Sequence, residues 1–305
     1  MTQYDKDMLV NKLVLALGQQ QVLTDEPMSA HTTFKIGGPA DLYVVPRSTE
    51  DMQTCLELVK EAAAPYFVLG LGSDLLVSDA GFRGVIIAAG DGLKFCEHHG
   101  NVLECGAGVS LKEATDKALE LGLGGFEFAC GIPGSVGGAC FMNAGAYGGT
   151  IQDVLKSVLV ITPTGELTEL GVDELALGYR TSRIKTDGLV VVRASFELTP
   201  HDSREIKARM DDLTRQREEK QPLEYGSAGS TFKRPEGHFA GKLITDAGLK
   251  GYRVGDAQVS LKHAGFVVNL NHATAADVHA VIEHVQAEVK RQFGVDLEPE
   301  VRFLG

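Results

Sequence analysis

Apolar and polar positions divide the first two hundred residues into short strand-like runs separated by two helical patterns. A helix is expected from the cap residue Ser48 to just before Pro65. A second helix is expected to begin at Ser110, with Glu113 completing a capping box, and to end at Gly122. Apolar runs predict strands at 40–46, 66–70, 85–89, 102–108 and 188–198, and a hairpin over 157–170.

The pattern changes near residue 201. A charged helix is expected over 202–219, and a second helix is expected between its cap residue Thr274 and Gly294. Strands are expected near 252–260 and 264–270. Helices and strands do not alternate regularly enough for a doubly wound parallel sheet, so we predict an α+β protein. Two domains are expected, 1–200 (lobes of about 1–65 and 66–200) and 201–305.

Composition and charge narrow the class of partner. The chain has 305 residues, 44% of them hydrophobic, and a formal net charge of −12. This charge argues against nucleic acid or an anionic membrane surface as a partner. The acidic excess falls in residues 1–200, whereas 201–305 are nearly balanced. The balanced part either carries basic groups for a small anionic ligand or is a solvated surface with uneven charge.

Cysteines and the first residues favour a reducing compartment. The five cysteines include no C-x-x-C pair and no metal-ligand spacing, so buried reduced thiols and no metal site are expected. Residues 1–18 contain early acids and no long apolar core, unlike a secretory signal. No apolar stretch reaches the roughly 20 residues of a membrane span. A cytoplasmic location is therefore expected.

The first of three glycine-rich segments is 68–84, where a strand runs into Gly70 and Gly72. A dinucleotide-binding fingerprint would need a third glycine at Leu75 and then a helix, and the sequence predicts neither. Two interpretations remain open. The turn is either a plain strand–turn–strand connection or a place where backbone N–H groups converge on an anion such as a diphosphate.

The second segment, 128–149, contains seven glycines within 19 residues and almost no charge. It is too apolar for a solvent loop and too rich in glycine for an ordinary core element. A backbone lying against a large, flat, partly apolar ligand, such as an isoalloxazine ring with its diphosphate, would explain both properties. A packed structural turn is the alternative.

The third segment, 224–235, places hydroxyl side chains ahead of Lys233 and Arg234. It is not a nucleophile elbow, because Ala228 occupies the serine position of G-x-S-x-G. The pattern predicts either an exposed hydroxyl beside cations or a surface turn.

In this order the three segments resemble the UDP-N-acetylenolpyruvoylglucosamine reductase family. The resemblance extends to residues 31–46, 178–185, 255–269 and 297–305. It implies a vanillyl-alcohol-oxidase-type (PCMH-like) FAD-binding region in 1–200 and a smaller α+β substrate-binding domain in 201–305, whose last residues return to the flavin site. The short connection from 185 to 188 resembles the shorter subtype, which lacks an inserted tyrosine-bearing loop.

The resemblance also implies the reaction. NADPH would reduce non-covalently bound FAD, which would convert UDP-N-acetylglucosamine enolpyruvate to UDP-N-acetylmuramate for peptidoglycan synthesis. The implied partner is a small UDP-sugar, with no nucleic acid and no membrane insertion, and a monomer is expected.

The resemblance assigns catalytic roles to Ser230, Arg180 and Glu300. Hydride addition to the terminal enolpyruvyl carbon leaves a carbanion beside a carboxylate, which a cation or an acid would stabilise. Arg180 and Glu300 match these positions, and Glu300 would then need a raised pKa. Ser230 matches the donor that protonates the adjacent carbon.

The remaining implied site residues bind cofactor or substrate. Asp74 differs from the asparagine common in the family and would repel a diphosphate, so it is expected to face away or to use only its backbone. Leu71 and Arg234 also depart from the commonest form. The cofactor set is Gly70, Gly72, Ser73, Asp74, Leu75, Gly131, Ile132, Pro133, Gly134, Ser135, Gly137, Gly138, Asn143, Gly145 and Arg302. The substrate set is Tyr179, Lys220, Lys233, Arg234 and Lys262.

Two rival functions stay open at this point. A sugar or alcohol oxidase of the same flavin fold would use oxygen and would often attach FAD through His or Cys. Cys130 is the candidate for such an attachment. A non-catalytic nucleotide-binding module would bind no flavin or show no turnover.

Overall fold

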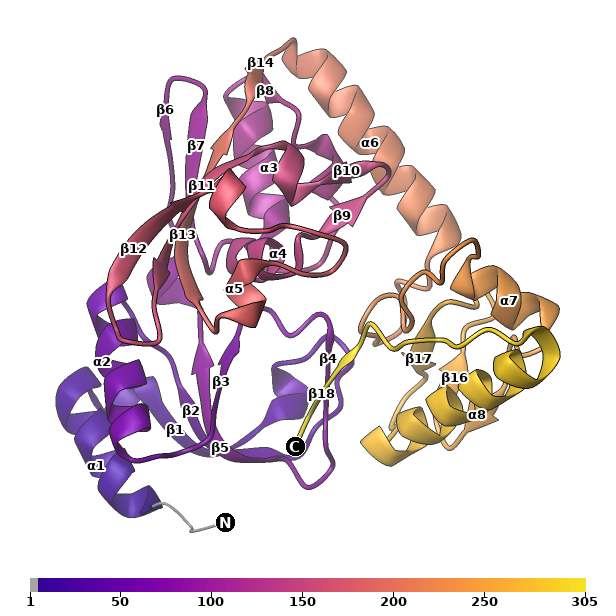
Figure 1. The fold of residues 1–305 in the computed structure, drawn as a ribbon, viewed down its shortest axis with the longest axis horizontal. Coiled ribbons are helices and arrows are strands. Elements are labelled where there is room, and N and C mark those ends of the chain that lie inside the picture. The colour runs from indigo at the N-terminus through magenta and orange to yellow at the C-terminus, as the bar shows by residue number, and fades with distance from the viewer. Residues whose placement is uncertain (1–4) are drawn as a thin grey trace. The chain divides into compact units, whose positions relative to one another are not determined.

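The computed structural model describes residues 5–305 (Figure 1). The chain divides into two compact units. Unit 1 comprises Met1–Thr24, Leu42–Leu71 and Gly84–Arg217, and unit 2 comprises Asp25–Asp41, Gly72–Arg83 and Glu218–Gly305. The α-helices are α1 (Lys6–Leu17), α2 (Thr49–Glu61), α3 (Leu111–Glu120), α4 (Val136–Met142), α5 (Arg183–Thr186), α6 (Ser203–Lys220), α7 (Ala240–Asp246) and α8 (Ala275–Phe293).

Unit 1 contains one complete sheet and most of a second. A five-stranded antiparallel sheet has the order β12 (Leu167–Gly171), β11 (Leu155–Ile161), β13 (Val190–Glu197), β7 (Val102–Gly106) and β6 (Cys96–His99). A four-stranded sheet has the order β1 (Val22–Pro27), β2 (Pro39–Val44), β5 (Phe82–Ala88) and β3 (Tyr66–Leu69). Three of its strands, β1, β2 and β5, have some of their residues in unit 2. Short pairs are formed by β9 (Gly145–Ala146) with β10 (Gly149–Thr150), and by β8 (Leu123–Gly124) with β14 (Thr199–Pro200).

Local caps fix the helices of unit 1 where the sequence predicts them. The Ser48 side chain accepts a hydrogen bond from the backbone N–H of Asp51 at the start of α2. Ser110 and Glu113 form the predicted capping box at the start of α3, and Gly122 follows its end with φ 67°. Apolar faces of α1, α2 and α3 join both sheets in one buried core.

Unit 2 has a small sheet and one long helix. The antiparallel order is β15 (Arg253–Val254), β16 (Ala257–Val259) and β17 (Val267–Asn269). Thr274, the predicted cap residue, forms a capping box with Asp277 at the start of α8, and Gly294 ends the helix in the left-handed conformation. The apolar stripe of α8 is buried: Val278, Val281, Ile282, Val285 and Val289.

In unit 2, a parallel pair of strands joins two segments that are far apart in the sequence. β18 (Arg302–Leu304), drawn in yellow, pairs with β4 (Leu75–Val77) (Figure 1). Neither this pairing nor α4, which lies inside the second glycine segment, follows from sequence periodicity. All strands predicted from apolar runs are present in whole or in part. The α+β fold class is confirmed. The domain limits at 65 and 200 stay predictions.

The prediction that the cysteines are buried is partly wrong. Cys55, Cys105 and Cys140 are buried, but Cys96 and Cys130 are partly exposed. Cys96 lies on β6, the edge strand of its sheet, and Cys130 ends a turn that α6 covers only in part. Over residues 5–305, no helix is both long and apolar enough to cross a membrane.

Candidate active site

The first glycine segment connects β3 to β4. A Cβ at Gly70 would overlap the hydroxyl oxygen of Ser135, so these two predicted cofactor residues lie side by side in unit 1. Gly72 has φ 60°, and a Cβ there would overlap the carbonyl oxygen of His31. Chain packing alone therefore requires glycine at position 72. A strand follows the turn, as predicted, in place of the helix of a dinucleotide fingerprint.

Three predicted cofactor residues meet where β18 joins β4 in unit 2. Arg302 is opposite Leu75, and its N–H donates to the Asp74 carbonyl over 2.8 Å. The Asp74 carbonyl is thus hydrogen-bonded within the protein. Leu75 is buried and Ser73 is half-buried beside it. A flavin contact for these residues stays a prediction.

The second glycine segment is held by its own backbone at the start of α4. The N–H of Val136 donates to Val109 over 2.8 Å, and the N–H of Gly137 donates to Ala107 over 3.0 Å. The N–H of Gly138 donates to the Ser135 hydroxyl over 3.3 Å. A Cβ at Gly137 would lie 2.9 Å from the Cβ of Ala107. Part of the glycine content therefore has a structural cause, the close approach of α4 to the end of β7.

The other predicted cofactor residues of this segment lie around that helix. The N–H of Ile132 donates to Ala129 over 3.0 Å, and the Gly134 carbonyl accepts from Leu111 over 2.9 Å. Gly145 pairs with Thr150 between β9 and β10. Pro133 is exposed.

Asn143 connects the end of α4 to the predicted catalytic turn. It is 5% exposed and has φ 43°. Its Nδ2 donates to the Gly178 carbonyl over 3.1 Å, and its Oδ1 accepts from the Gln152 N–H over 3.0 Å. The Ser182 hydroxyl donates to the Phe141 carbonyl over 2.7 Å. These bonds fix the turn to α4 from both ends. The amide of Asn143 is therefore used for positioning.

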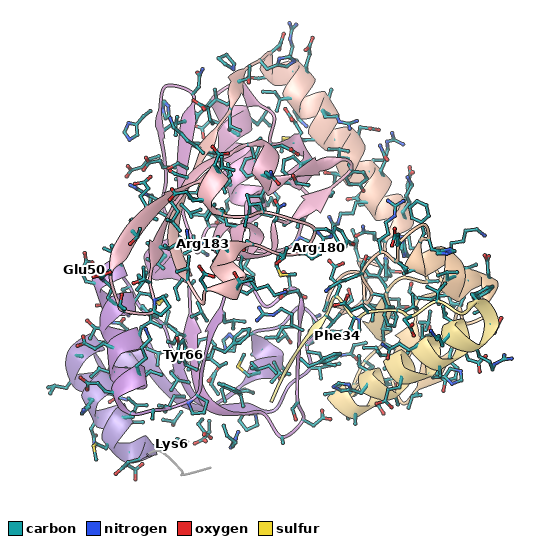
Figure 2. The ribbon with its side chains drawn as sticks, in the orientation of Figure 1. Lys6, Phe34, Glu50, Tyr66, Arg180 and Arg183 are labelled. Atoms are coloured by element: carbon teal, nitrogen blue, oxygen red, sulfur yellow. The ribbon has the colours of Figure 1, made fainter. Side chains whose placement is uncertain are left out.

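The turn itself presents Tyr179 and Arg180. Gly178 and Thr181 exchange two backbone hydrogen bonds, with Gly178 N–H to Thr181 O at 3.0 Å. Arg180 has φ 57°, a conformation that ordinary residues rarely adopt and that favours glycine. Its guanidinium carbon lies 5.3 Å from the centre of the Tyr179 ring, and Tyr179 is 58% exposed. Figure 2 labels Arg180 together with Arg183, which is the first residue of α5. Strained backbone of this kind is typical of functional positions.

Arg217, on α6, lies against the second glycine segment, and the sequence did not single it out. A Cβ at Gly131 would lie 2.9 Å from its Cδ. Burial lowers the pKa of Arg217, because it disfavours the charged form. A half-buried cation beside a glycine segment is compatible with an anionic ligand such as the FAD diphosphate. The only sequence signal is its spacing, one helical turn before Lys220.

In unit 2 a buried threonine brings two predicted catalytic residues together. Thr231 is 2% exposed, and its hydroxyl accepts from the Val267 N–H over 2.9 Å. Its N–H donates to Gly265 over 2.8 Å, and its carbonyl accepts from the Glu300 N–H over 2.8 Å. Ser230 is exposed and precedes Thr231 directly. Ser230 and Glu300 are thus held next to each other by backbone bonds to one residue.

The predicted substrate cations differ in their surroundings. Lys233 forms an ion pair with Glu298, which compensates part of its charge. The guanidinium of Arg234 lies 4.0 Å from the centre of the Phe239 ring. Lys262 Nζ donates to the Glu218 carbonyl over 2.6 Å. Lys220 is exposed at the end of α6.

Comparison with known proteins gives the class first. Residues 40–171 match a family described as an FAD binding domain, and residues 221–304 match the family described as UDP-N-acetylenolpyruvoylglucosamine reductase, C-terminal domain. The chain is thus an FAD-containing oxidoreductase with a separate C-terminal part. Within the residues that the structure describes, no three His, Cys, Asp or Glu side chains are grouped to hold a metal ion.

Whole-length relatives then give the family. The chain is 51% identical over 292 residues to the UDP-N-acetylenolpyruvoylglucosamine reductase of Clostridium beijerinckii, covering 94% of each chain. It is 52% identical over 297 residues to that of Geobacillus thermodenitrificans, covering 97% of each. The crystal structure of the Thermus caldophilus reductase matches with a TM-score of 0.77 and 36% identity, over 93% of this chain and 98% of that one. The chain belongs to the UDP-N-acetylenolpyruvoylglucosamine reductase family.

Two adjacent glycines of α4, Gly137 and Gly138, give a matched test of the close contact between α4 and Ala107. Gly137→Ala should lower the free energy of unfolding of the FAD-free protein by more than about 1 kcal/mol, because its methyl group would press on Ala107. Gly138→Ala should raise the same quantity by about 0.5–1 kcal/mol, because its nearest neighbour, the Ser135 hydroxyl, is 3.4 Å away and alanine favours helix. Urea unfolding measures both. Equal effects of the two substitutions would contradict the tight contact at Gly137.

Proposed function

We propose that the protein reduces UDP-N-acetylglucosamine enolpyruvate to UDP-N-acetylmuramate, with NADPH as the source of electrons. The proposal rests on the whole-length similarity to reductases of that name, and it is supported by the paired placement of Ser230 and Glu300 around Thr231. An oxidase function has no such support.

FAD, when bound, supplies the hydride for the terminal carbon of the enolpyruvyl group. We infer that unit 1 holds its diphosphate through backbone N–H groups and a cation. Since Ile132, Val136, Gly137 and Gly138 donate their N–H groups within the protein, the candidates are Gly131, Gly134 and Ser135. Arg217 is the candidate cation, because an anion would compensate its half-buried charge.

Arg180 has the role of binding the substrate carboxylate. Hydride addition leaves negative charge on the carbon next to that carboxylate, and a guanidinium stabilises this charge through directed hydrogen bonds. The turn from Gly178 to Thr181 is anchored through Asn143 and Ser182, so the cation is preorganised.

Ser230 has the role of proton donor, and Glu300 assists it. The carbanion is a strong enough base to take a hydroxyl proton, and the serine side chain is protonated at neutral pH. Glu300 contributes as a neutral acid or through water. Backbone bonds on both sides of Thr231 limit the movement of the two residues relative to each other.

The remaining cations suit a UDP-sugar. Lys220, Lys262 and Arg234 are proposed to bind its diphosphate, and Lys233 is proposed to bind it in exchange for its contact with Glu298. Tyr179 is exposed beside Arg180 and offers a hydroxyl and a ring face. We further propose a monomer in the cytoplasm with no nucleic-acid partner, in keeping with the net charge of −12.

The function and the role of Ser230 are tested together under anaerobic conditions. NADPH should bleach the flavin absorbance, and the enolpyruvyl UDP-sugar, but not buffer, should restore it. Ser230→Ala should leave bleaching unchanged and slow restoration by about 100-fold or more, since general acid catalysis contributes about 10²–10⁴-fold. Ser227→Ala, in the same loop, is the matched control and should behave as the unaltered protein. Absence of restoration by the UDP-sugar would refute the function, and normal restoration in Ser230→Ala would remove serine from the mechanism.

The strained turn predicts a division between stability and activity at Arg180. Arg180→Gly should be more stable to urea than Arg180→Ala by about 1 kcal/mol, because glycine adopts φ 57° without the Cβ penalty. Both variants lack the guanidinium, so both should restore flavin absorbance slowly with the UDP-sugar while NADPH bleaches them normally. Equal stabilities would contradict a left-handed backbone at this residue in solution.

A further inference from the structure

Two cysteines of the five-stranded sheet face each other across neighbouring strands. Cys96 on β6 is directly opposite Cys105 on β7, and their sulfur atoms are 3.0 Å apart. Neither residue belongs to the cofactor or substrate sets described above. We propose that Cys96 and Cys105 form a reversible cross-strand disulfide, a redox modification site with Cys96 as the attacking thiol.

The backbone register permits the bond. The N–H of Gly106 donates to the Phe95 carbonyl over 3.0 Å, so Phe95 and Gly106 form a hydrogen-bonded pair. Because hydrogen-bonded and non-hydrogen-bonded pairs alternate along antiparallel strands, the next pair, Cys96 with Cys105, is a non-hydrogen-bonded one. Opposite Cα atoms at such positions are about 4.5 Å apart, within the span of roughly 4.4–6.8 Å that a disulfide bridges. The sulfur atoms need only close from 3.0 Å to about 2.05 Å.

The two thiols are unequal in the way that exchange chemistry requires. The hydrogen bond between the two thiols lowers the pKa of Cys96. The Lys117 ammonium acts in the same direction, and burial and two glutamates act against it. Cys105 is fully buried, and its hydrogen bond to Cys96 together with burial raises its pKa. Cys96 lies on the edge strand and is partly exposed. It is therefore the thiol that a small oxidant reaches, and Cys105 is the one that resolves.

The other three cysteines lack this combination. Burial raises the pKa of Cys55 and of Cys140 to about 12 in each case, and both are buried. Cys130 is partly exposed, but burial also raises its pKa. It approaches the Met210 carbonyl and the Thr214 hydroxyl. Cys130 is thus an accessible cysteine with no thiol partner in these contacts, which makes it the matched control.

The reaction balances with a small-molecule disulfide as oxidant. The Cys96 thiolate attacks one sulfur of that disulfide, forms a mixed disulfide and releases one small thiolate, which takes up the proton lost from Cys96. Cys105 then gives up its proton, and its sulfur attacks the Cys96 sulfur and displaces the second small thiol. The two protein thiols lose two electrons in all, and the small disulfide gains them.

The proposed disulfide lies close to the residues that hold α4. Just beyond the end of β7, the carbonyls of Ala107 and Val109 accept hydrogen bonds from the first N–H groups of α4. A covalent link between β6 and β7 therefore stiffens the support of the second glycine segment without touching it.

Oxidised glutathione and the FAD-loaded protein provide the test, with peptide mapping by mass spectrometry under non-reducing conditions. We expect a cross-linked pair of peptides carrying Cys96 and Cys105, and full recovery of the free thiols with dithiothreitol. Iodoacetamide added after the protein has been unfolded in urea should label neither cysteine of the oxidised protein. Cys96→Ser should abolish the cross-link, Cys105→Ser should leave stable glutathione on Cys96, and Cys130→Ser should cross-link as the unaltered protein does.

Three outcomes would overturn the proposal. They are persistent glutathione on Cys96 without a cross-link in the unaltered protein, faster modification of Cys130 than of Cys96, and no loss of labelling at Cys96. Mapping of the unaltered protein decides among them even where Cys105→Ser does not fold.

Discussion

Close packing of backbone against backbone at α4 is the constraint on which the rest of unit 1 depends. A side chain at Gly137 would meet Ala107, and the N–H groups at the start of α4 are bonded to the end of β7. At the other end of the helix, buried Asn143 binds the turn that carries Arg180. A short helix without room for a methyl group at Gly137 thereby links a five-stranded sheet to the turn of Arg180, the arginine proposed to bind the substrate carboxylate. These contacts explain how the turn can hold strained backbone.

In unit 2, a buried threonine holds the residues proposed to do chemistry. The N–H, carbonyl and hydroxyl of Thr231 are hydrogen-bonded to three backbone partners, one of which is Glu300. Ser230, the proposed proton donor, directly precedes this residue, so the bonds of Thr231 also restrict its backbone. In both units the residues proposed to do chemistry are exposed or half-buried, and buried polar neighbours hold them. This arrangement leaves the reactive groups open to substrate and keeps their orientation fixed.

Local signals carried the sequence predictions that are confirmed. Capping boxes at Ser110 and Thr274 and the glycine at 294 act within a few residues, so they can be read from the chain alone. The pairing of β18 with β4 and the contact of Arg217 with Gly131 join distant segments, and no local pattern encodes them. Glycine content has a second cause that the sequence does not reveal. Gly72 and Gly137 are predicted as ligand contacts, and protein atoms also require glycine at both positions. The roles of individual site residues came from family resemblance and stay predictions.

The central claim is that this chain adds a hydride to one carbon of the enolpyruvyl group and a proton from a solvent-exchangeable donor to the next. Turnover with unlabelled NADPH in deuterium oxide tests it most directly, with nuclear magnetic resonance to locate the label in the UDP-sugar product. Since a serine hydroxyl exchanges with solvent, the account predicts a reduced product carrying deuterium on the carbon that bears the carboxylate. A reduced product with hydrogen alone on that carbon, or substrate recovered unchanged after the flavin has been reduced, would contradict the account.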